Sequence, residues 1–99
     1  MPLDEMARKS ETDAVLARMA AVLLLGNNIN WAAALERCRA VLWTDWDEAR
    51  RSIRGSYGGM GSLNDIVLYA DGVVLTREQE EFDRLRHRLY ELVQLQVEP

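Results

Sequence analysis

Apolar residues recur at helical spacing in four separate segments of the chain. The first segment predicts a helix that begins at about Leu3 or Thr12 and ends at Leu25, where Gly26 and Asn27 can adopt the left-handed conformation that stops a helix. Residues 1–11 are strongly polar, so we expect this end to be prone to fraying. The side chains expected to face the core are Val15, Met19, Val22 and Leu23.

Two shorter helices are predicted in the middle of the chain. Asn30 is a suitable N-cap for the first, which should extend to about Trp43, and Thr44 opens the second. Acids at the start of the second and arginines in its later turns have the signs that complement a helix dipole. The expected core residues are Trp31, Ala34, Leu35, Cys38, Val41 and Leu42 in the first and Trp46, Ala49 and Ile53 in the second.

The last helix has a regular apolar stripe and an acidic first turn. Thr76 and Gln79 have the spacing of a capping box, and the helix should continue to about Gln94. Its apolar stripe comprises Phe82, Leu85, Leu89, Leu92 and Val93.

The segment before the last helix has a different texture. Four of the six glycines lie at positions 55–61, which predicts a loop. Two short β-prone runs, 66–69 and 73–75, then flank an Asp-Gly pair, which is typical of a β-hairpin. A two-stranded hairpin is marginal by itself, so we expect it to lie on the helices. The competing interpretation makes Ser62 the N-cap of a short helix over residues 63–69.

These elements predict a mainly α protein, with about four helices in one core and a short β-hairpin or irregular segment before the last helix. A chain of 99 residues has the usual size of one domain, so we assign residues 1–99 to a single domain. The hydrophobic share of 48% is that of a folded globular protein.

The formal net charge is -4, from 16 acidic and 12 basic residues. Because phosphate binding rests on basic surface, we expect no nucleic-acid partner, whereas mild acidity favours a basic protein partner. Cys38 is the single cysteine, so no intramolecular disulfide can form. The longest apolar stretch, residues 20–25, is far shorter than the roughly 20 residues of a membrane span, and the N-terminus lacks the pattern of a signal peptide. We therefore expect a cytoplasmic protein without membrane association.

The glycine-rich segment Tyr57–Asp65 is the most unusual motif. Successive free N–H groups in such a loop can cradle an anion. The dinucleotide-binding fingerprint fails, however, because Asn64 occupies the place of its third glycine, and no lysine follows as a P-loop requires. We therefore favour a structural loop rather than a ligand site. In this interpretation the side chain of Asn64 or Asp65 forms hydrogen bonds with the backbone of the loop itself. Its density of special residues still makes it the first candidate for a functional surface.

The single histidine and the single cysteine predict no catalytic or metal site. His87 belongs to the polar side of the last helix, where Asp83 and Glu91 lie one turn away and give surface ion pairs. Cys38 falls on an apolar stripe and is expected to pack as a small hydrophobe. Because the two residues are on different helices, we expect no zinc site, and no cofactor is predicted.

The tryptophans and a run of acids each have two interpretations. Trp31, Trp43 and Trp46 fit core positions, and the same residue type dominates interface hot spots. The acids within residues 45–48 complement a helix dipole, and the same group would suit docking to a basic partner.

The glycine-rich run, an acidic start to the last helix and the pattern Leu85…Leu89-Tyr90-Glu91-Leu92 together resemble a family of small uncharacterised bacterial domains. The likeness covers about residues 14–95, and its specific part is the Gly-Gly-Met-Gly-Ser-Leu-Asn-Asp stretch. The family has no assigned activity, so the resemblance implies a bacterial cytosolic origin and supplies no functional residues.

We expect a small acidic protein-binding module rather than an enzyme, either of the immunity or antitoxin type or a regulator that occludes an enzyme. The sequence offers no recognisable set of paired acids, nucleophile or metal ligands. The predicted partner-binding face joins the loop to the acids of the third helix and comprises Tyr57, Met60, Asn64, Asp65, Asp45, Asp47 and Glu48.

Two alternatives stay open. Short helical domains often complete a thin core by dimerising, so a self-associating module, with a second copy of the chain as its partner, is the first alternative. The second is an enzyme or anion-binding domain that uses the glycine-rich loop, with Asp65 as a base.

Overall fold

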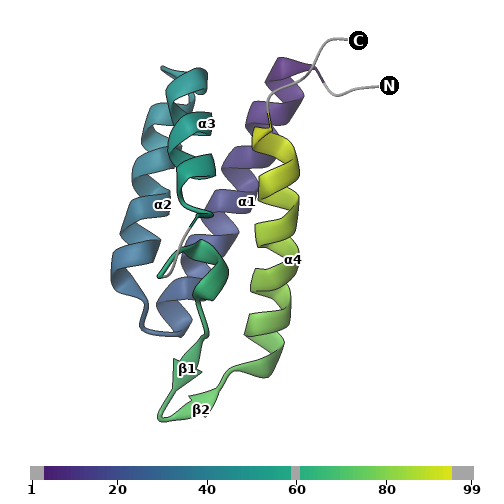
Figure 1. The fold of residues 1–99 in the computed structure, drawn as a ribbon. Helices are drawn as coiled ribbons and strands as arrows, with labels where there is room; N and C mark the ends of the chain where they lie inside the picture. The colour runs from purple at the N-terminus through teal and green to yellow at the C-terminus, as the bar shows by residue number, and fades with distance from the viewer. Residues whose placement is uncertain (1–3, 59–60, 95–99) are drawn as a thin grey trace.

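The computed structural model describes residues 4–58 and 61–94 and contains four α-helices (Figure 1). The helices are α1 (Glu5–Leu25), α2 (Ile29–Leu42), α3 (Trp46–Gly55) and α4 (Thr76–Val93). Between α3 and α4, a short 3-10 helix η1 (Leu63–Asp65) precedes the antiparallel strands β1 (Tyr69–Ala70) and β2 (Val73–Val74). The predicted fold class, four helices with a hairpin before the last, is confirmed.

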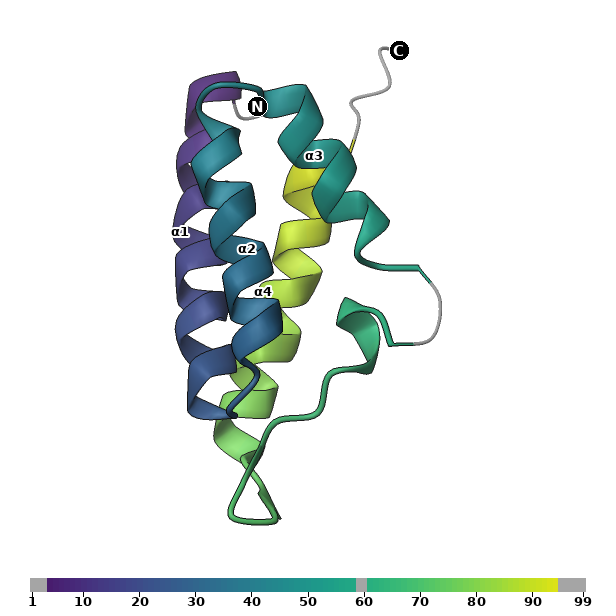
Figure 2. The same cartoon turned by 90° about the vertical axis from the view of Figure 1, so that its left-hand side faces the viewer.

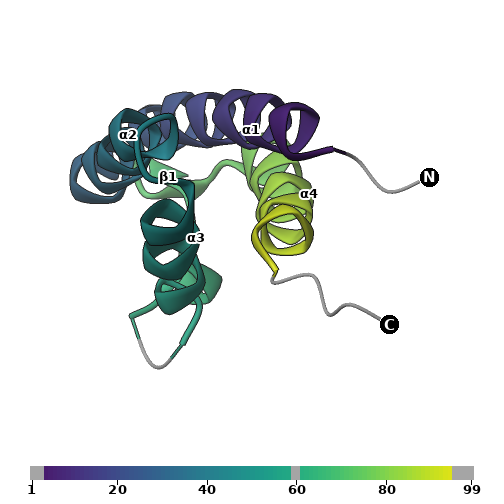
Figure 3. The ribbon, with the colours of Figure 1, turned by 90° about the horizontal axis from the view of Figure 1, so that it is seen from above.

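The helices are arranged around α1 and α2, which lie side by side (Figure 3). α4 packs against α1, and α3 packs against α2. α3 and α4 therefore lie at opposite edges of the layer that α1 and α2 form. Their contact with each other is smaller than that of the pairs α1–α2, α1–α4 and α2–α3. The chain that links them supplies buried apolar side chains of its own, namely Leu63, Ile66 and Leu68. The core is therefore built by four helices and one irregular segment.

Helical periodicity identified most of this core. The predicted stripes of α1 and α3 are buried, and in α4 only Leu85 is partly exposed. In α2, Trp31, Ala34, Cys38 and Val41 are only partly buried, whereas Ala32, which was not predicted, is 3% exposed. A small side chain at that position lets α2 lie close to its neighbour.

α1 begins at Glu5, nearer the earlier of the two predicted starts. Asp4 caps it, since its carboxylate accepts the Ala7 N–H at 2.7 Å. Within the polar first turns, Glu11 accepts two bonds from the Arg88 guanidinium of α4, at 2.6 and 2.7 Å. Residues 5–11 are thus helical and are joined to α4.

The predicted N-caps of α2 and α3 are wrong by one or two positions. Asn27 has a positive φ of 59°, and the Asn28 N–H bonds back to the Leu23 carbonyl at 2.8 Å. This compact turn lets α2 start at Ile29, before the predicted cap Asn30. At the next junction Thr44 still bonds back into α2, so Asp45 becomes the cap of α3.

The predicted capping box of α4 is also wrong. Thr76 is the first helical residue, and the N-cap position, Leu75, makes no side-chain bond. The Gln79 side chain instead reaches the preceding segment: its Oε1 accepts the Leu68 N–H at 2.8 Å, and its Nε2 donates to the Ile66 carbonyl at 3.1 Å. Gln79 therefore satisfies the Leu68 N–H and the Ile66 carbonyl, while the Leu68 carbonyl accepts the Leu75 N–H at 2.8 Å.

Both interpretations of residues 62–75 are correct in part. Ser62 does act as a cap, because its hydroxyl accepts the Asn64 N–H at 3.2 Å, but the helix lasts only one turn. The hairpin follows, and its turn residues Asp71 and Gly72 have φ of 53° and 76°. Two positive φ values are the signature of a type I′ turn, which agrees with the hairpin that the Asp-Gly pair predicted.

The expectation that the hairpin lies on the helices is wrong. Figures 1 and 2 show both strands beyond the ends of α1 and α2. The hairpin is anchored at its base, where Leu68 is buried. Leu68 lies so close to Gly26 that a Cβ added at Gly26 would be 2.8 Å from Leu68 Cδ2. Because the contact is at the base, the strands themselves are left exposed to solvent.

Candidate functional site

The structure separates the predicted binding face into two clusters. Asp45, Asp47 and Glu48 stand at the start of α3, whereas Tyr57 follows its end. A ten-residue helix is about 15 Å long, so the two clusters lie at opposite ends of α3. The remaining loop residues, Asn64 and Asp65, lie in η1 near Tyr57, and Met60 lies outside the described residues.

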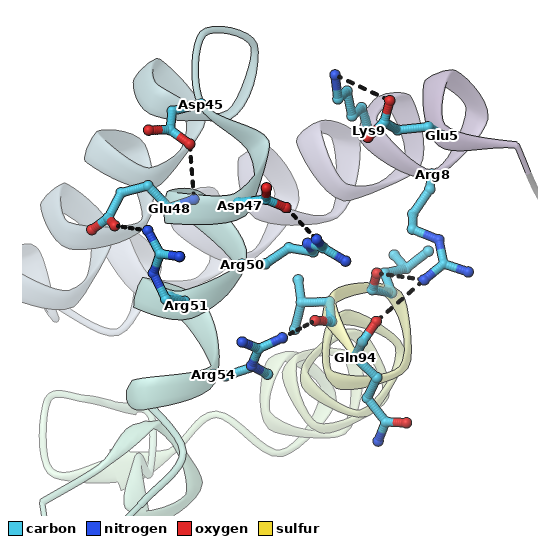
Figure 4. Close-up of polar contacts among 12 residues, drawn as sticks. Glu5, Arg8, Lys9, Asp45, Asp47, Glu48, Arg50, Arg51, Arg54 and Gln94 are labelled. Atoms are coloured by element: carbon cyan, nitrogen blue, oxygen red, sulfur yellow. Dashed lines mark hydrogen bonds and ion pairs between the residues drawn. The ribbon is translucent and has the colours of Figure 1, made fainter. Parts of the chain in front are cut away.

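The acidic cluster, Asp45, Asp47 and Glu48, is occupied by local interactions (Figure 4). The Asp45 carboxylate accepts the Glu48 N–H at 3.1 Å and so caps α3. Asp47 pairs with Arg50, and Glu48 pairs with Arg51 at 2.8 Å. The hydrogen bond from Arg51 to Glu48 raises the pKa of the Arg51 guanidinium. Dipole complementation and capping thus explain these three acids.

The glycine-rich loop is held by its own polar side chains. Asn64 Nδ2 donates to the Tyr57 carbonyl at 2.8 Å, and the Asp65 carboxylate accepts the Gly61 N–H at 2.8 Å. Gly61 has a positive φ of 74°, which glycine tolerates without strain. These bonds match the structural interpretation of the loop. They also occupy the Gly61 N–H that an anion would need.

The loop meets α4 in a cleft that we call the loop cleft. It has a volume of about 290 Å³ and is lined by Tyr57, Asn64, Arg86, His87 and Tyr90. The Tyr57 hydroxyl donates to the Arg86 carbonyl at 2.6 Å, and its ring meets that of Tyr90 edge to face, with centroids 5.1 Å apart. Burial raises the pKa of the Tyr57 hydroxyl.

Sequence reasoning missed the α4 side of this cleft. Arg86 and Tyr90 are four residues apart and so lie on one helix face, a spacing that could have been noticed. Nothing in the sequence, however, indicated that Tyr57 would reach them across the fold. His87 itself is 79% exposed and lies 4.0 Å from Glu91, in agreement with its interpretation as a surface residue.

The other singled-out side chains agree in part with expectation. Cys38 is partly buried, and burial raises the pKa of its thiol, as suits a packing role. Trp46 is buried and Trp31 partly buried, but Trp43 is 47% exposed. Within residues 4–58 and 61–94, no group of three or more acids, histidines and cysteines is placed to hold a metal ion. No helix in the same residues is long and apolar enough to cross a bilayer.

The most unusual surface was not predicted at all. Seven large apolar residues, each with a side chain that is 43–66% exposed, belong to the segments at the end of the molecule where the hairpin projects, as the ribbon of Figure 1 shows for those segments. We call this surface the hairpin end, and its members are Leu24, Leu25, Ile29, Val67, Tyr69, Val73 and Val74. The first three come from the end of α1 and the start of α2, and the turn between these helices contacts the hairpin base through Gly26 and Leu68.

An apolar groove opens toward the same end. It lies between α1 and α2, has a volume of about 350 Å³, and includes Leu24 and Ile29 of the hairpin end. Glu36 is the one charged residue in its lining. The other lining residues are alanines, namely Ala17, Ala20, Ala21, Ala32 and Ala33. Apolar surface thus extends from the hairpin end along the outer side of the α1–α2 layer.

Comparison with known proteins places the chain in a family without adding an activity. No curated protein and no solved structure matches the chain at a significant level. The family model described as Domain of unknown function (DUF6966) matches residues 25–76, which run from the end of α1 to the start of α4. Since this is just over half of the sequence, the chain belongs to the DUF6966 family.

Proposed function

We propose that this protein is a binding module that attaches to another protein and inhibits or regulates it by occlusion, rather than a catalyst. An immunity or antitoxin role in a bacterial cytoplasm is the specific form of this proposal. The observation that carries it is the hairpin end, where seven large apolar side chains are exposed together.

Exposed apolar side chains at this density call for an explanation. Single exposed hydrophobic residues are normal on a soluble protein, whereas apolar side chains gathered at one place are typical of interaction surfaces. The core does not need these side chains, since Leu68 and Leu75 already anchor the hairpin. Tyr69, which is 49% exposed, is of the residue class that dominates interface hot spots.

The binding face predicted from the sequence remains part of the proposal in a modified form. A partner that used both of its clusters would have to span the length of α3. The loop cleft can accept a partner side chain separately, because it lies on the α4 side of the molecule. The apolar side chains of the hairpin end have fewer internal interactions that a partner would need to replace than the acidic cluster and the loop cleft have. The hairpin end is therefore the better-supported contact.

Site-specific photo-crosslinking in cells of the native host tests the proposal. A photoreactive residue at Val73 reports on the hairpin end, and one at the exposed Ser52 reports on the outer side of α3. We expect a discrete adduct with another protein from Val73 and none from Ser52. An adduct from Ser52 alone would favour the originally predicted face. No adduct from either position would contradict the proposed function.

Self-association is the second candidate function, and the alanine-lined groove favours it. Small residues along two adjacent helices allow close approach of another helix. If a second copy is the occupant, the Val73 adduct has twice the mass of the chain, and the molar mass in solution rises with protein concentration. A constant monomer mass would exclude this alternative.

A further inference from the structure

The hairpin end and the adjoining start of α4 carry a net negative charge. Residues 69–80 contain three carboxylates, Asp71, Glu78 and Glu80, against one base, Arg77, which leaves a net charge of -2. Among the described residues, none of these three carboxylates has an ion-pair partner. The next acid of α4 differs from them: Glu81 pairs with Arg18 at 2.6 Å.

The carboxylates lie on both sides of the exposed apolar strands. Asp71 occupies the turn between Tyr69–Ala70 and Val73–Val74, so it stands at the tip of the hairpin. Glu78 and Glu80 follow β2 in the first turns of α4, next to the base of the hairpin. The α1–α2 turn, residues 24–30, contributes no charged residue. An apolar surface with an acidic rim results.

We infer that the hairpin end binds a protein with a basic surface, whose lysine or arginine side chains pair with Asp71, Glu78 and Glu80 around an apolar centre. This inference rests on the proposed function and specifies the chemistry of its partner. Interfaces commonly combine an apolar centre with a polar rim, and complementary rim charge speeds association and excludes wrong partners.

The same charge argues against the other occupants. Two copies that met through this end would bring equal acidic rims together, since a two-fold interface uses one patch twice. Anionic lipid headgroups and nucleic-acid phosphates would likewise be repelled. A basic protein is the occupant for which both the apolar and the charged parts of the surface are favourable.

The probe for the test is a display library of short random peptides, selected on the immobilised full-length protein. We expect the enriched peptides to combine large apolar residues with lysine or arginine. The charge variant is Asp71→Asn with Glu80→Gln, and asparagine tolerates the positive φ of Asp71. Its matched control, Asp4→Asn with Glu5→Gln, changes the net charge equally at the start of α1, where asparagine can still cap the helix.

We expect the charge variant to weaken binding of the enriched peptides about threefold to tenfold at low salt, and the control to leave it unchanged. Enrichment of neutral or acidic peptides, or equal weakening by both variants, would overturn the inference. Val73→Ser with Val74→Ser separates the two proposals. If this pair leaves peptide binding intact, or if no peptide is enriched, the hairpin end is not a binding surface and the proposed function fails as well.

Discussion

At the scale of single residues, position in the fold decided which side chains have structural duties. Asp45 and Glu48 are both exposed acids near the start of α3, and the sequence grouped them in one binding face. The structure distinguishes them, because Asp45 satisfies a backbone N–H that the helix start leaves free, whereas Glu48 only pairs with the exposed Arg51. The main role of the Asp45 carboxylate is therefore to cap α3.

Replacing Asp45 tests this distinction. Asp45→Ala removes the N-cap of α3 and should lower the free energy of unfolding by about 1 kcal/mol. Glu48→Gln removes only an exposed ion pair and should change it by less than about 0.5 kcal/mol. Urea denaturation followed by circular dichroism measures both. Equal losses in the two variants would show that Asp45 does not act as a cap.

At the scale of elements, the hairpin depends on a side chain of the following helix. Gln79 supplies one acceptor to the Leu68 N–H and one donor to the Ile66 carbonyl, whereas the strand across the hairpin bonds only the Leu68 carbonyl, through the Leu75 N–H. Such side-chain bonds replace the ladder that a longer sheet would provide. The periodicity of α4 could not reveal this contact, because Gln79 fitted a capping box equally well by spacing alone.

Gln79→Ala and Thr76→Ala separate the two roles. Loss of Gln79 leaves partly buried groups of Leu68 and Ile66 without partners, which should cost about 1–3 kcal/mol of stability. Thr76→Ala should cost less than about 0.5 kcal/mol, because Thr76 makes no cap bond. Hydrogen exchange should also become faster at the Leu68 amide in the first variant. If Thr76→Ala is the more damaging, the capping box is real.

At the scale of the whole molecule, charged pairs join helices that are distant in sequence. Arg88 of α4 binds Glu11 of α1, and Arg18 of α1 binds Glu81 of α4 at 2.6 and 2.9 Å. The Arg54 guanidinium of α3 donates to the Val93 carbonyl, and that of Arg8 to the Leu92 carbonyl, so both cap the end of α4 (Figure 4). α4 is thus held at several points of its length.

The Glu11–Arg88 pair predicts a specific pH dependence. Its hydrogen bond holds the pKa of Glu11 below the ordinary value of 4.5, so the unfolded chain binds the proton more readily than the folded protein. The contribution of the pair is complete above pH 4.5 and is lost as pH falls through the lower pKa of the folded state.

The measurement is the thermal midpoint of the wild type and Glu11→Gln as a function of pH. At neutral pH the variant should melt about 2 °C lower, a small difference because the pair is partly exposed. Below the folded-state pKa the two curves should converge. Glu80→Gln, with the same change of charge but no ion pair among the described residues, should follow the wild type throughout. A gap between wild type and Glu11→Gln that persists in acid would contradict the assignment.

Much of the fold was determined by the sequence alone. The 3.6-residue period of apolar side chains specified four helices and most of their buried faces, because periodicity is a local property of each helix. The Asp71-Gly72 pair specified a hairpin turn for the same local reason, since few residues accept two positive φ values. Asn64 and Asp65 were also correctly expected to hold their own loop.

Only the tertiary structure decided what lies next to what. It placed Tyr57 beside Tyr90, separated the two halves of the predicted binding face by the length of α3, and left the hairpin strands beyond the helices. Contacts between segments depend on the packing of the whole core, which no local pattern contains. The apolar sequence of Val73 and Val74 by itself suggests burial. Whether a strand is buried depends, however, on whether another element covers it. In the described structure no element covers these two valines, which are exposed.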